Sequence, residues 1–173
     1  LIIDVADGGM TGVLRGSDPI TTRVLSNGNM IAFGTSAGTV RAVDLSTGRV
    51  LWNAPTGQPV VDGEMAMAQG AIFWGHNDKL VSWDQQSGEE IANVTLEGSL
   101  LPGIAVQGQR LLVGMRRPKV HNLPVRDVLQ AFNLTDLTVL WEFESPVKTP
   151  GPFGVDSLTV AFPGSSDEVV TFR

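Results

Sequence analysis

A thirteen-residue pattern that recurs along the chain limits its possible folds more than any other feature. The pattern is clearest over residues 40–52, which read VRAVDLSTGRVLW, and degraded copies of it lie at four other places. Its central aspartate, Asp44, is matched by Asp4, Asp84, Asn133 and Arg173, at successive intervals of 40, 40, 49 and 40 residues. A period in this range is typical of repeat architectures, in which similar units pack side by side. Such a chain builds extended surfaces, and it gains special sites where one unit departs from the others.

Short β-type runs alternate with turn residues inside each repeat, and no stretch has the periodicity of a helix. The clearest unit predicts strands over Ile20–Leu25, Met30–Gly34, Thr39–Asp44 and Arg49–Asn53. The next unit predicts strands over Glu64–Ala68, Ala71–Gly75, Lys79–Asp84 and Glu89–Thr95. Four antiparallel strands every 40 residues or so form one blade of a β-propeller. The sequence therefore predicts an all-β chain with blades at about 19–57, 58–98 and 99–149 and partial blades at 1–18 and 150–173.

The turn between the third and fourth strands explains most of the repeated residues. Asp44 can accept hydrogen bonds from the N–H groups that follow it, and Gly48 can take the positive φ of a tight turn. Trp52 then offers a flat surface for packing one blade on the next. The third unit lacks the glycine and has Asp136 nearby. Residues of the structural repeat motif are Asp4, Gly8, Asp44, Thr47, Gly48, Trp52, Asp84, Gly88, Asn133 and Trp141.

The four tryptophans have different predicted places. Trp52 and Trp141 occupy the packing position of the repeat, and Trp83 follows the third-strand column that also holds Val43 and Phe132. All three tryptophans are therefore expected in the core, whereas a second-strand residue such as Trp74 is less defined.

The stretch Ala42-x-Asp44-x-x-Thr47-Gly48-x-x-x-Trp52 resembles the PQQ-type, or quinoprotein-like, propeller repeat. Looser copies lie at 82–88 and 130–141, and the resemblance covers essentially the whole chain. It implies a segment of about four blades from a larger ring of seven or eight. The family includes quinone-dependent dehydrogenases. It also includes non-catalytic members such as the propeller lipoprotein of outer-membrane assembly, the large subunit of the ER membrane complex and the ectodomains of some kinases. The resemblance thus implies an extracytoplasmic place (periplasm, cell surface or ER lumen) in a membrane-associated complex.

Composition narrows the possible functions. The formal net charge of −6 and the absence of a basic domain argue against a nucleic-acid partner. The chain has no run of 18 apolar residues and no Cys, so neither a transmembrane segment nor thiol chemistry is expected. The dehydrogenases of the family would imply a quinone, a calcium ion and a catalytic carboxylate, often with adjacent cysteines. No such grouping is recognisable, so no cofactor or catalytic residue is predicted, and Asp44, Asp84 and Asp127 are assigned to backbone hydrogen bonding.

The third unit is nine residues longer than its neighbours, and the extra length falls in Met115–Asp127. Four of the chain's 12 basic residues lie in this loop. Long loops on a rigid scaffold often carry binding residues, so the loop could meet an acidic segment of a partner or an anionic lipid headgroup. A tolerated, solvated insertion is the alternative. The candidate partner-binding residues are Arg116, Arg117, Lys119, His121, Arg126 and His76, the two histidines being expected on one rim because they follow equivalent strands.

The sequence therefore favours a non-catalytic scaffold that presents loops to other protein subunits. Part of a quinone-dependent dehydrogenase and a ligand-sensing kinase ectodomain remain as alternatives. Asn93 and Asn133 each begin an N-x-Thr acceptor pattern, which matters only if the protein enters a eukaryotic secretory pathway.

Overall fold

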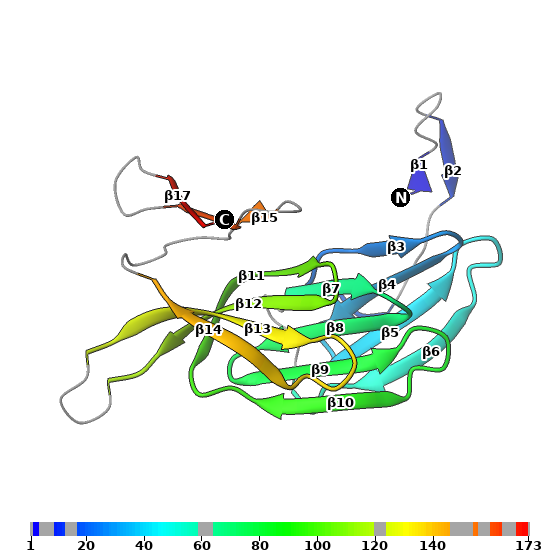
Figure 1. Cartoon of the computed structure of the whole chain (residues 1–173). Coiled ribbons are helices and arrows are strands. Elements are labelled where there is room, and N and C mark those ends of the chain that lie inside the picture. The colour runs from blue at the N-terminus through cyan, green and yellow to red at the C-terminus, as the bar shows by residue number, and fades with distance from the viewer. Residues whose placement is uncertain are drawn as a thin grey trace. The chain divides into compact units, whose positions relative to one another are not determined.

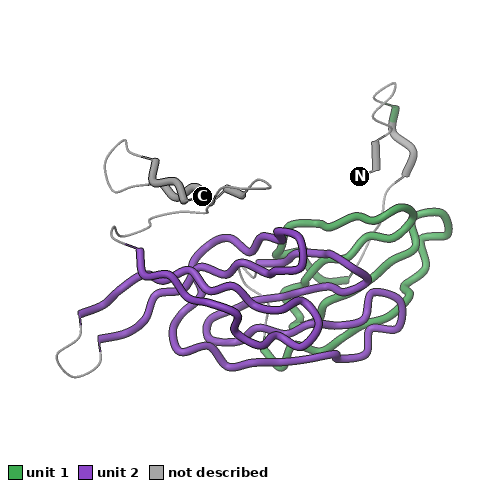
Figure 2. The backbone as a smooth tube through the Cα atoms, in the orientation of Figure 1, with its two compact units in different colours: residues 1–61 green, residues 62–173 purple. Residues whose placement is uncertain are grey.

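The computed structural model describes residues 2–3, 9–12, 17–58, 64–119, 124–145, 154–155, 160–163 and 169–172. Asp4, Gly8 and His121 lie outside these ranges, so their predicted roles stay predictions. Strands, turns and connections make up the described residues, with no helix among them. The chain divides into two compact units, Leu1–Val61 and Asp62–Arg173 (Figure 2).

The first unit contains a two-stranded and a four-stranded antiparallel sheet. The two-stranded sheet pairs β1 (Ile2–Ile3) with β2 (Met10–Gly12). The four-stranded sheet has its strands in chain order: β3 (Leu25–Asn27), β4 (Met30–Thr35), β5 (Thr39–Asp44) and β6 (Val50–Pro55). Val40 and Ala42 on β5 are completely buried.

The second unit contains two four-stranded antiparallel sheets and one of three strands (Figure 1). The first sheet is formed by β7 (Glu64–Ala68), β8 (Ala71–His76), β9 (Lys79–Asp84) and β10 (Glu90–Thr95). The second is formed by β11 (Ser99–Gln107), β12 (Arg110–Arg117), β13 (Arg126–Asn133) and β14 (Val139–Glu144). The third is formed by β15 (Gly154–Val155), β16 (Val160–Pro163) and β17 (Val169–Phe172). The all-β class and the four-stranded repeat are thus confirmed.

The core of the second unit lies between the facing sheets β7–β10 and β11–β14. Phe73 and Leu80 of the first sheet join Leu111, Val113 and other apolar residues of the second sheet in one buried cluster. Removal of such side chains from water is the main stabilising contribution to this packing. A small residue is required where the sheets meet most closely. A Cβ atom on Gly75 would lie 2.6 Å from Leu100 Cδ1 and 2.7 Å from Ile104 Cδ1.

The first strand of the four-stranded sheet in the first unit differs from the prediction. The sequence predicts a strand over Ile20–Leu25, but β3 covers Leu25–Asn27 and Ile20 forms an isolated bridge. The cause is a side chain that replaces part of the main-chain ladder. The Gly34 N–H of β4 donates to the hydroxyl oxygen of Thr22 at 2.8 Å, so the segment before β3 runs beside β4 without regular pairing.

A β-bulge recurs at one place in all three four-stranded sheets. The register of β6 skips Leu51, which has no opposing residue on β5. The equivalent skipped residues are Ile91 on β10 and Leu140 on β14. Their side chains are 49%, 46% and 47% exposed. Since β6, β10 and β14 are outermost in their sheets, each bulge bends an open edge and disrupts it as a template for further strands.

The nine extra residues of the third repeat lengthen a hairpin and are not all loop. β12 and β13 have eight residues each, against six in the equivalent strands, and their pairing continues to Arg117 opposite Arg126. Residues 118–125 form the connection, so the predicted loop Met115–Asp127 begins and ends as strand. Figure 1 shows the β12–β13 hairpin extending beyond the other strands of its sheet. We call the segment 115–127 the arm.

Three of the four tryptophans are buried, and Trp141 is not. Trp52 is 8% exposed, Trp83 3% and Trp74 1%, whereas Trp141 is 39% exposed, which corrects its predicted core position. Trp141 pairs with Ala131, one residue from Phe132, so it lies on the sheet face opposite to the core cluster. In the third-strand column, Val43, Trp83 and Phe132 are buried as predicted.

Candidate functional site

The repeated aspartates hold equivalent turns. The Asp44 carboxylate accepts hydrogen bonds from the N–H groups of Ser46 and Thr47, both at 2.9 Å. The Asp84 carboxylate accepts the same pair of bonds from Gln86 and Ser87, at 2.9 and 2.7 Å. The carbonyl of each aspartate also accepts the N–H of the turn glycine four residues later. Both carboxylates are therefore structural, as the sequence predicts.

The third turn keeps this geometry without the aspartate or the glycine. Asn133 Oδ1 accepts the Thr135 N–H at 2.8 Å, and the Asn133 carbonyl accepts the Leu137 N–H at 3.0 Å. Leu137 takes the place of the glycine with φ of 57°, close to the 67° of Gly48 and the 73° of Gly88. Leu137 is 2% exposed and belongs to the core cluster, so its burial opposes the cost of its left-handed backbone.

Hydrogen bonds donated within these turns lower the pKa values of the Asp44 and Asp84 carboxyl groups. Bonds from the Ser46 side chain and the Thr47 N–H lower the pKa of Asp44 to about 2 from 3.8. Bonds from the N–H groups of Ser87 and Gln86 lower the pKa of Asp84. All these donors stabilise the ionised form, so the turns are tightest when the carboxylates carry charge.

The three arginines of the arm form ion pairs within the protein. Arg116 and Asp127 face each other across the β12–β13 pair, with Nε–Oδ1 and Nη2–Oδ2 distances of 2.7 and 2.9 Å. The Asp127 side chain is 2% exposed and the Arg116 side chain 43%. The bidentate bond to Asp127 raises the pKa of Arg116. Asp127 was predicted to bond the backbone, and its carboxylate instead holds the base of the arm through this ion pair.

Further ion pairs bind the two other arginines of the arm. Arg117 lies 2.5 Å from the carboxylate of Glu142 and 3.2 Å from that of Glu97. Arg126 lies 2.8 Å from Glu144. The positive charge that the sequence places on the arm is therefore largely neutralised by acidic residues of β14 and of the β10–β11 connection. Sequence reasoning missed these acidic partners because they come from other parts of the chain.

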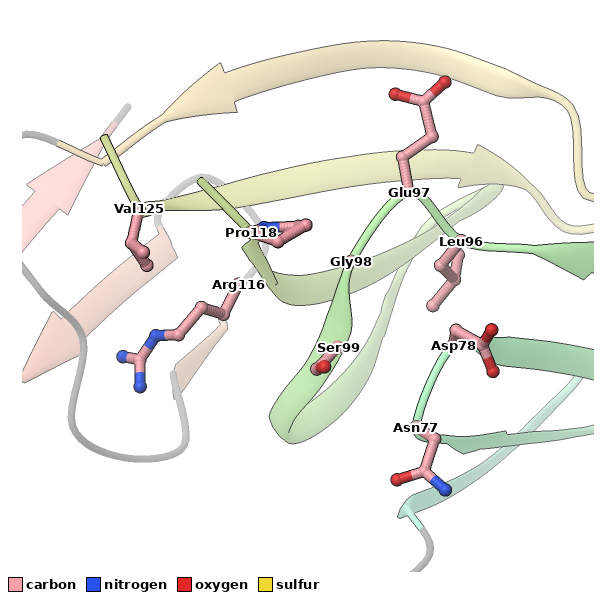
Figure 3. Close-up of a pocket in the computed structure, with 9 residues that line it drawn as sticks. All are labelled: Asn77, Asp78, Leu96, Glu97, Gly98, Ser99, Arg116, Pro118 and Val125. Atoms are coloured by element: carbon pink, nitrogen blue, oxygen red, sulfur yellow. The ribbon is translucent and has the colours of Figure 1, made fainter. Parts of the chain in front are cut away.

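A pocket opens at the base of the arm, entirely within the second unit (Figure 3). Its volume is about 680 Å³, and three connections line it. They are the β8–β9 turn, the β10–β11 connection and the two ends of the arm connection. The lining residues are Asn77, Asp78, Leu96, Glu97, Gly98, Ser99, Arg116, Pro118 and Val125.

Main-chain contacts fix the floor of this pocket. The Leu96 N–H donates to the Asp78 carbonyl, and the Leu100 N–H donates to the Asn77 carbonyl, both at 2.6 Å. Gly98 lies against the arm so closely that a Cβ atom there would be 2.5 Å from the Arg116 carbonyl oxygen. The pocket is thus a built feature of the fold, held by backbone on two sides.

Of the two candidate histidines, the structure describes His76. Its ring stacks on the indole of Trp74 at a centroid distance of 5.8 Å and an interplanar angle of 20°. His76 ends β8, directly before the pocket residue Asn77. Lys119 is exposed on the arm. His76, Arg116, Arg117 and Arg126 lie around one end of the sheets. Because His121 lies outside the described residues, the prediction that both histidines share one rim stays a prediction.

Among the described residues, no three His, Asp or Glu side chains come close enough together to hold a metal ion. The same residues include no helix with the length and apolarity needed to cross a membrane.

Solved structures with this fold include natural and designed propellers. The computationally designed Ika4 protein shares 13% identity over 94% of this chain and 98% of its own, with a TM-score of 0.72. BamB from Moraxella catarrhalis shares 14% identity over 86% of this chain, with a TM-score of 0.67. The quinohemoprotein alcohol dehydrogenase from Comamonas testosteroni shares 18% identity over 76% of this chain and 22% of its own, with a TM-score of 0.60.

These likenesses show the fold, and the sequence family adds a closer relationship. This chain spans 41% of the length of the Moraxella BamB. No curated protein matches the sequence. The family described as outer membrane protein assembly factor BamB matches residues 36–173, and the chain therefore belongs to this family of PQQ-like propeller proteins.

Proposed function

We propose that this chain is a non-catalytic scaffold that binds other protein subunits at the end of its sheets where the arm lies. By its family description it would work in outer membrane protein assembly, outside the cytoplasm and within a membrane-associated complex. Because the chain spans less than half of the BamB structure it matches, this role concerns the larger propeller of which such a segment would form part.

The arm is the observation that carries this proposal. The three four-stranded sheets share one turn geometry and one bulge position, so they serve as a regular frame. The arm departs from that frame by lengthening β12 and β13, and it forms a pocket with connections of the neighbouring sheet. Binding residues on repeat proteins concentrate where a rigid frame carries such an insertion.

The roles of the carboxylates also favour a scaffold over an enzyme. Asp44 and Asp84 hold turns, and Asp127 is paired with Arg116. Each of these groups is engaged in holding the fold, and a repeated turn residue differs from the singular, poised carboxylate that catalysis requires.

Photo-crosslinking of the full-length protein in membranes of its own cells tests the proposal. A crosslinking amino acid at Lys119 on the arm should give a discrete adduct with another protein. The same group at Ser87, an exposed turn residue at the opposite end of its sheet, should not. A quinone chromophore in the purified protein, together with calcium-dependent, dye-linked alcohol oxidation, would overturn the scaffold in favour of a dehydrogenase.

A further inference from the structure

The pocket at the base of the arm is acidic, although the sequence of the arm is rich in basic residues. Its lining includes two carboxylates, from Asp78 and Glu97, and one guanidinium, from Arg116. Arg116 already donates to Asp127 from Nε and Nη2, which form one edge of its guanidinium. Within the described part of the chain, the exposed Asp78 carboxylate has no ion-pair partner. Glu97 is paired with Arg117, which it shares with Glu142. Two guanidinium groups, of Arg116 and Arg117, thus face four carboxylates at the pocket, those of Asp78, Glu97, Asp127 and Glu142, and a binding segment would meet net negative charge here.

The pocket also offers apolar surface. Leu96 is 6% exposed and forms part of its wall, while Val125 of the arm is 47% exposed. Figure 3 shows Val125 and Pro118 on one side and Asp78 on the other, with Ser99 between them. An apolar side chain can thus contact the arm while a cationic neighbour reaches the carboxylates across the pocket.

We propose that this pocket binds an extended segment of a partner protein in which a Lys or Arg stands next to an apolar residue. The proposal rests on the scaffold function proposed above and names the chemistry of the partner. A volume of about 680 Å³ lies within the range of pockets that bind ligands. Complementary charge would steer the segment to the site, and burial of its apolar side chain would retain it.

The proposal can be tested with a labelled nine-residue peptide in which Val and Lys alternate, measured by fluorescence anisotropy against the full-length protein. Two matched peptides replace every Lys with Glu or every Val with Ser. The Val–Lys peptide should bind at least tenfold more tightly than the Glu peptide and several-fold more tightly than the Ser peptide. Equal or tighter binding of the Glu peptide, or equal binding of the Ser peptide, would overturn the proposal.

Variants of the protein locate the site. Asp78→Asn combined with Glu97→Gln should weaken binding of the Val–Lys peptide about tenfold, since two exposed charge pairs with the peptide are lost. Val125→Ser should weaken it about threefold, because part of an apolar contact is lost. Glu89→Gln is the matched control: it removes one exposed carboxylate at the far end of the same sheet and should leave affinity unchanged.

The experiments distinguish a wrong pocket proposal from a wrong scaffold proposal. Unchanged affinity in the double variant, with an unchanged thermal transition, would overturn the pocket proposal. If the Lys119 crosslink persisted in that case, the protein would remain a scaffold that binds elsewhere on the arm. Binding of Ca²⁺ ions to the pocket, seen as Asp78-dependent heat by calorimetry in the absence of peptide binding, would also overturn the proposal by making it a cation site.

Discussion

At the scale of single residues, the geometry of the turn is kept more strictly than the residue types that form it. In the three described turns, the side chain three positions after the repeated Asp or Asn accepts an N–H two residues later. Thr47 does so for Arg49 at 3.3 Å, Ser87 for Glu89 at 3.2 Å and Asp136 for Thr138 at 3.0 Å. The sequence predicts the first two turns from Asp and Gly. It could not predict the third, because there a buried leucine stands in the glycine position.

Glycine suits the left-handed backbone at position 137, yet we expect the Leu137→Gly substitution to destabilise the protein. Leu137→Gly removes a left-handed residue with a side chain, a gain of about 1 kcal/mol, but loses the burial of a whole leucine, which costs about 2–5 kcal/mol. We expect a net loss of about 2 kcal/mol in the free energy of unfolding, measured by urea denaturation. Gly88→Ala should lose about 1 kcal/mol, since it adds only backbone strain at φ of 73°. A more stable Leu137→Gly variant would show that strain outweighs burial.

The Asp44 turn should make stability depend on pH in an acidic window. Its pKa in the folded chain is about 2 against an ordinary 3.8, so its stabilising contribution is complete above about pH 4 and is lost as the pH falls through 2. Asp44→Asn keeps an acceptor, as Asn133 shows, but cannot titrate. The native protein should be more stable than Asp44→Asn at pH 6, and the difference should shrink between pH 4 and pH 2.5 in denaturant titrations. A difference independent of pH would contradict this role.

At the scale of elements, the sequence predicts strands well where the ladder is made by main chain. The strands β5, β7 and β9 match their predicted bounds. The prediction fails before β3, where the Thr22 hydroxyl enters the ladder, and at the arm, where pairing continues to Arg117. A hydroxyl that accepts a hydrogen bond in place of a main-chain carbonyl, and an ion pair between strands, both depend on residues distant in sequence. The alternation of apolar and polar residues along one strand does not reveal such neighbours.

The bulge on each outermost strand gives an element-scale prediction. Leu140 is the skipped residue of β14 and is 47% exposed, so Leu140→Lys should change the free energy of unfolding by less than about 0.5 kcal/mol. Deletion of Leu140 removes the bulge and leaves Val139 opposite Phe132 and Trp141 opposite Ala131, so it should also change the free energy of unfolding only slightly. Circular dichroism during thermal unfolding measures both. A large loss of stability on deletion alone would show that the bulge is needed to hold the register of β14.

At the scale of the whole molecule, the repeat determines the frame and its departures determine the candidate site. The period of 40 residues predicts the four-stranded sheets, and the arm follows from the one longer interval. The pocket could be foreseen only in part. The sequence shows that residues 77–78, 97–99 and 116–125 are connections or near them. Their meeting depends on hydrogen bonds such as that of the Leu96 N–H to the Asp78 carbonyl, which link neighbouring elements.

The connection of the arm should be replaceable without loss of the folded sheets but with loss of peptide binding. Arg117 pairs directly with Arg126, so a two-residue Asn-Gly turn can replace residues 118–125 and close the hairpin. Because the core cluster uses no residue of this connection, the thermal transition should move by only about 2–4 °C. Binding of the Val–Lys peptide should weaken about tenfold or more, since Pro118 and Val125 no longer line the pocket.

Gln69→Asn is the control, because it places the same Asn-Gly pair in the β7–β8 turn, where Gln69 and Gly70 already have φ of 50° and 79°. It should leave peptide affinity intact. A drop of more than 10 °C on arm replacement would mean that the arm belongs to the frame, and unchanged peptide binding would mean that the segment docks without it.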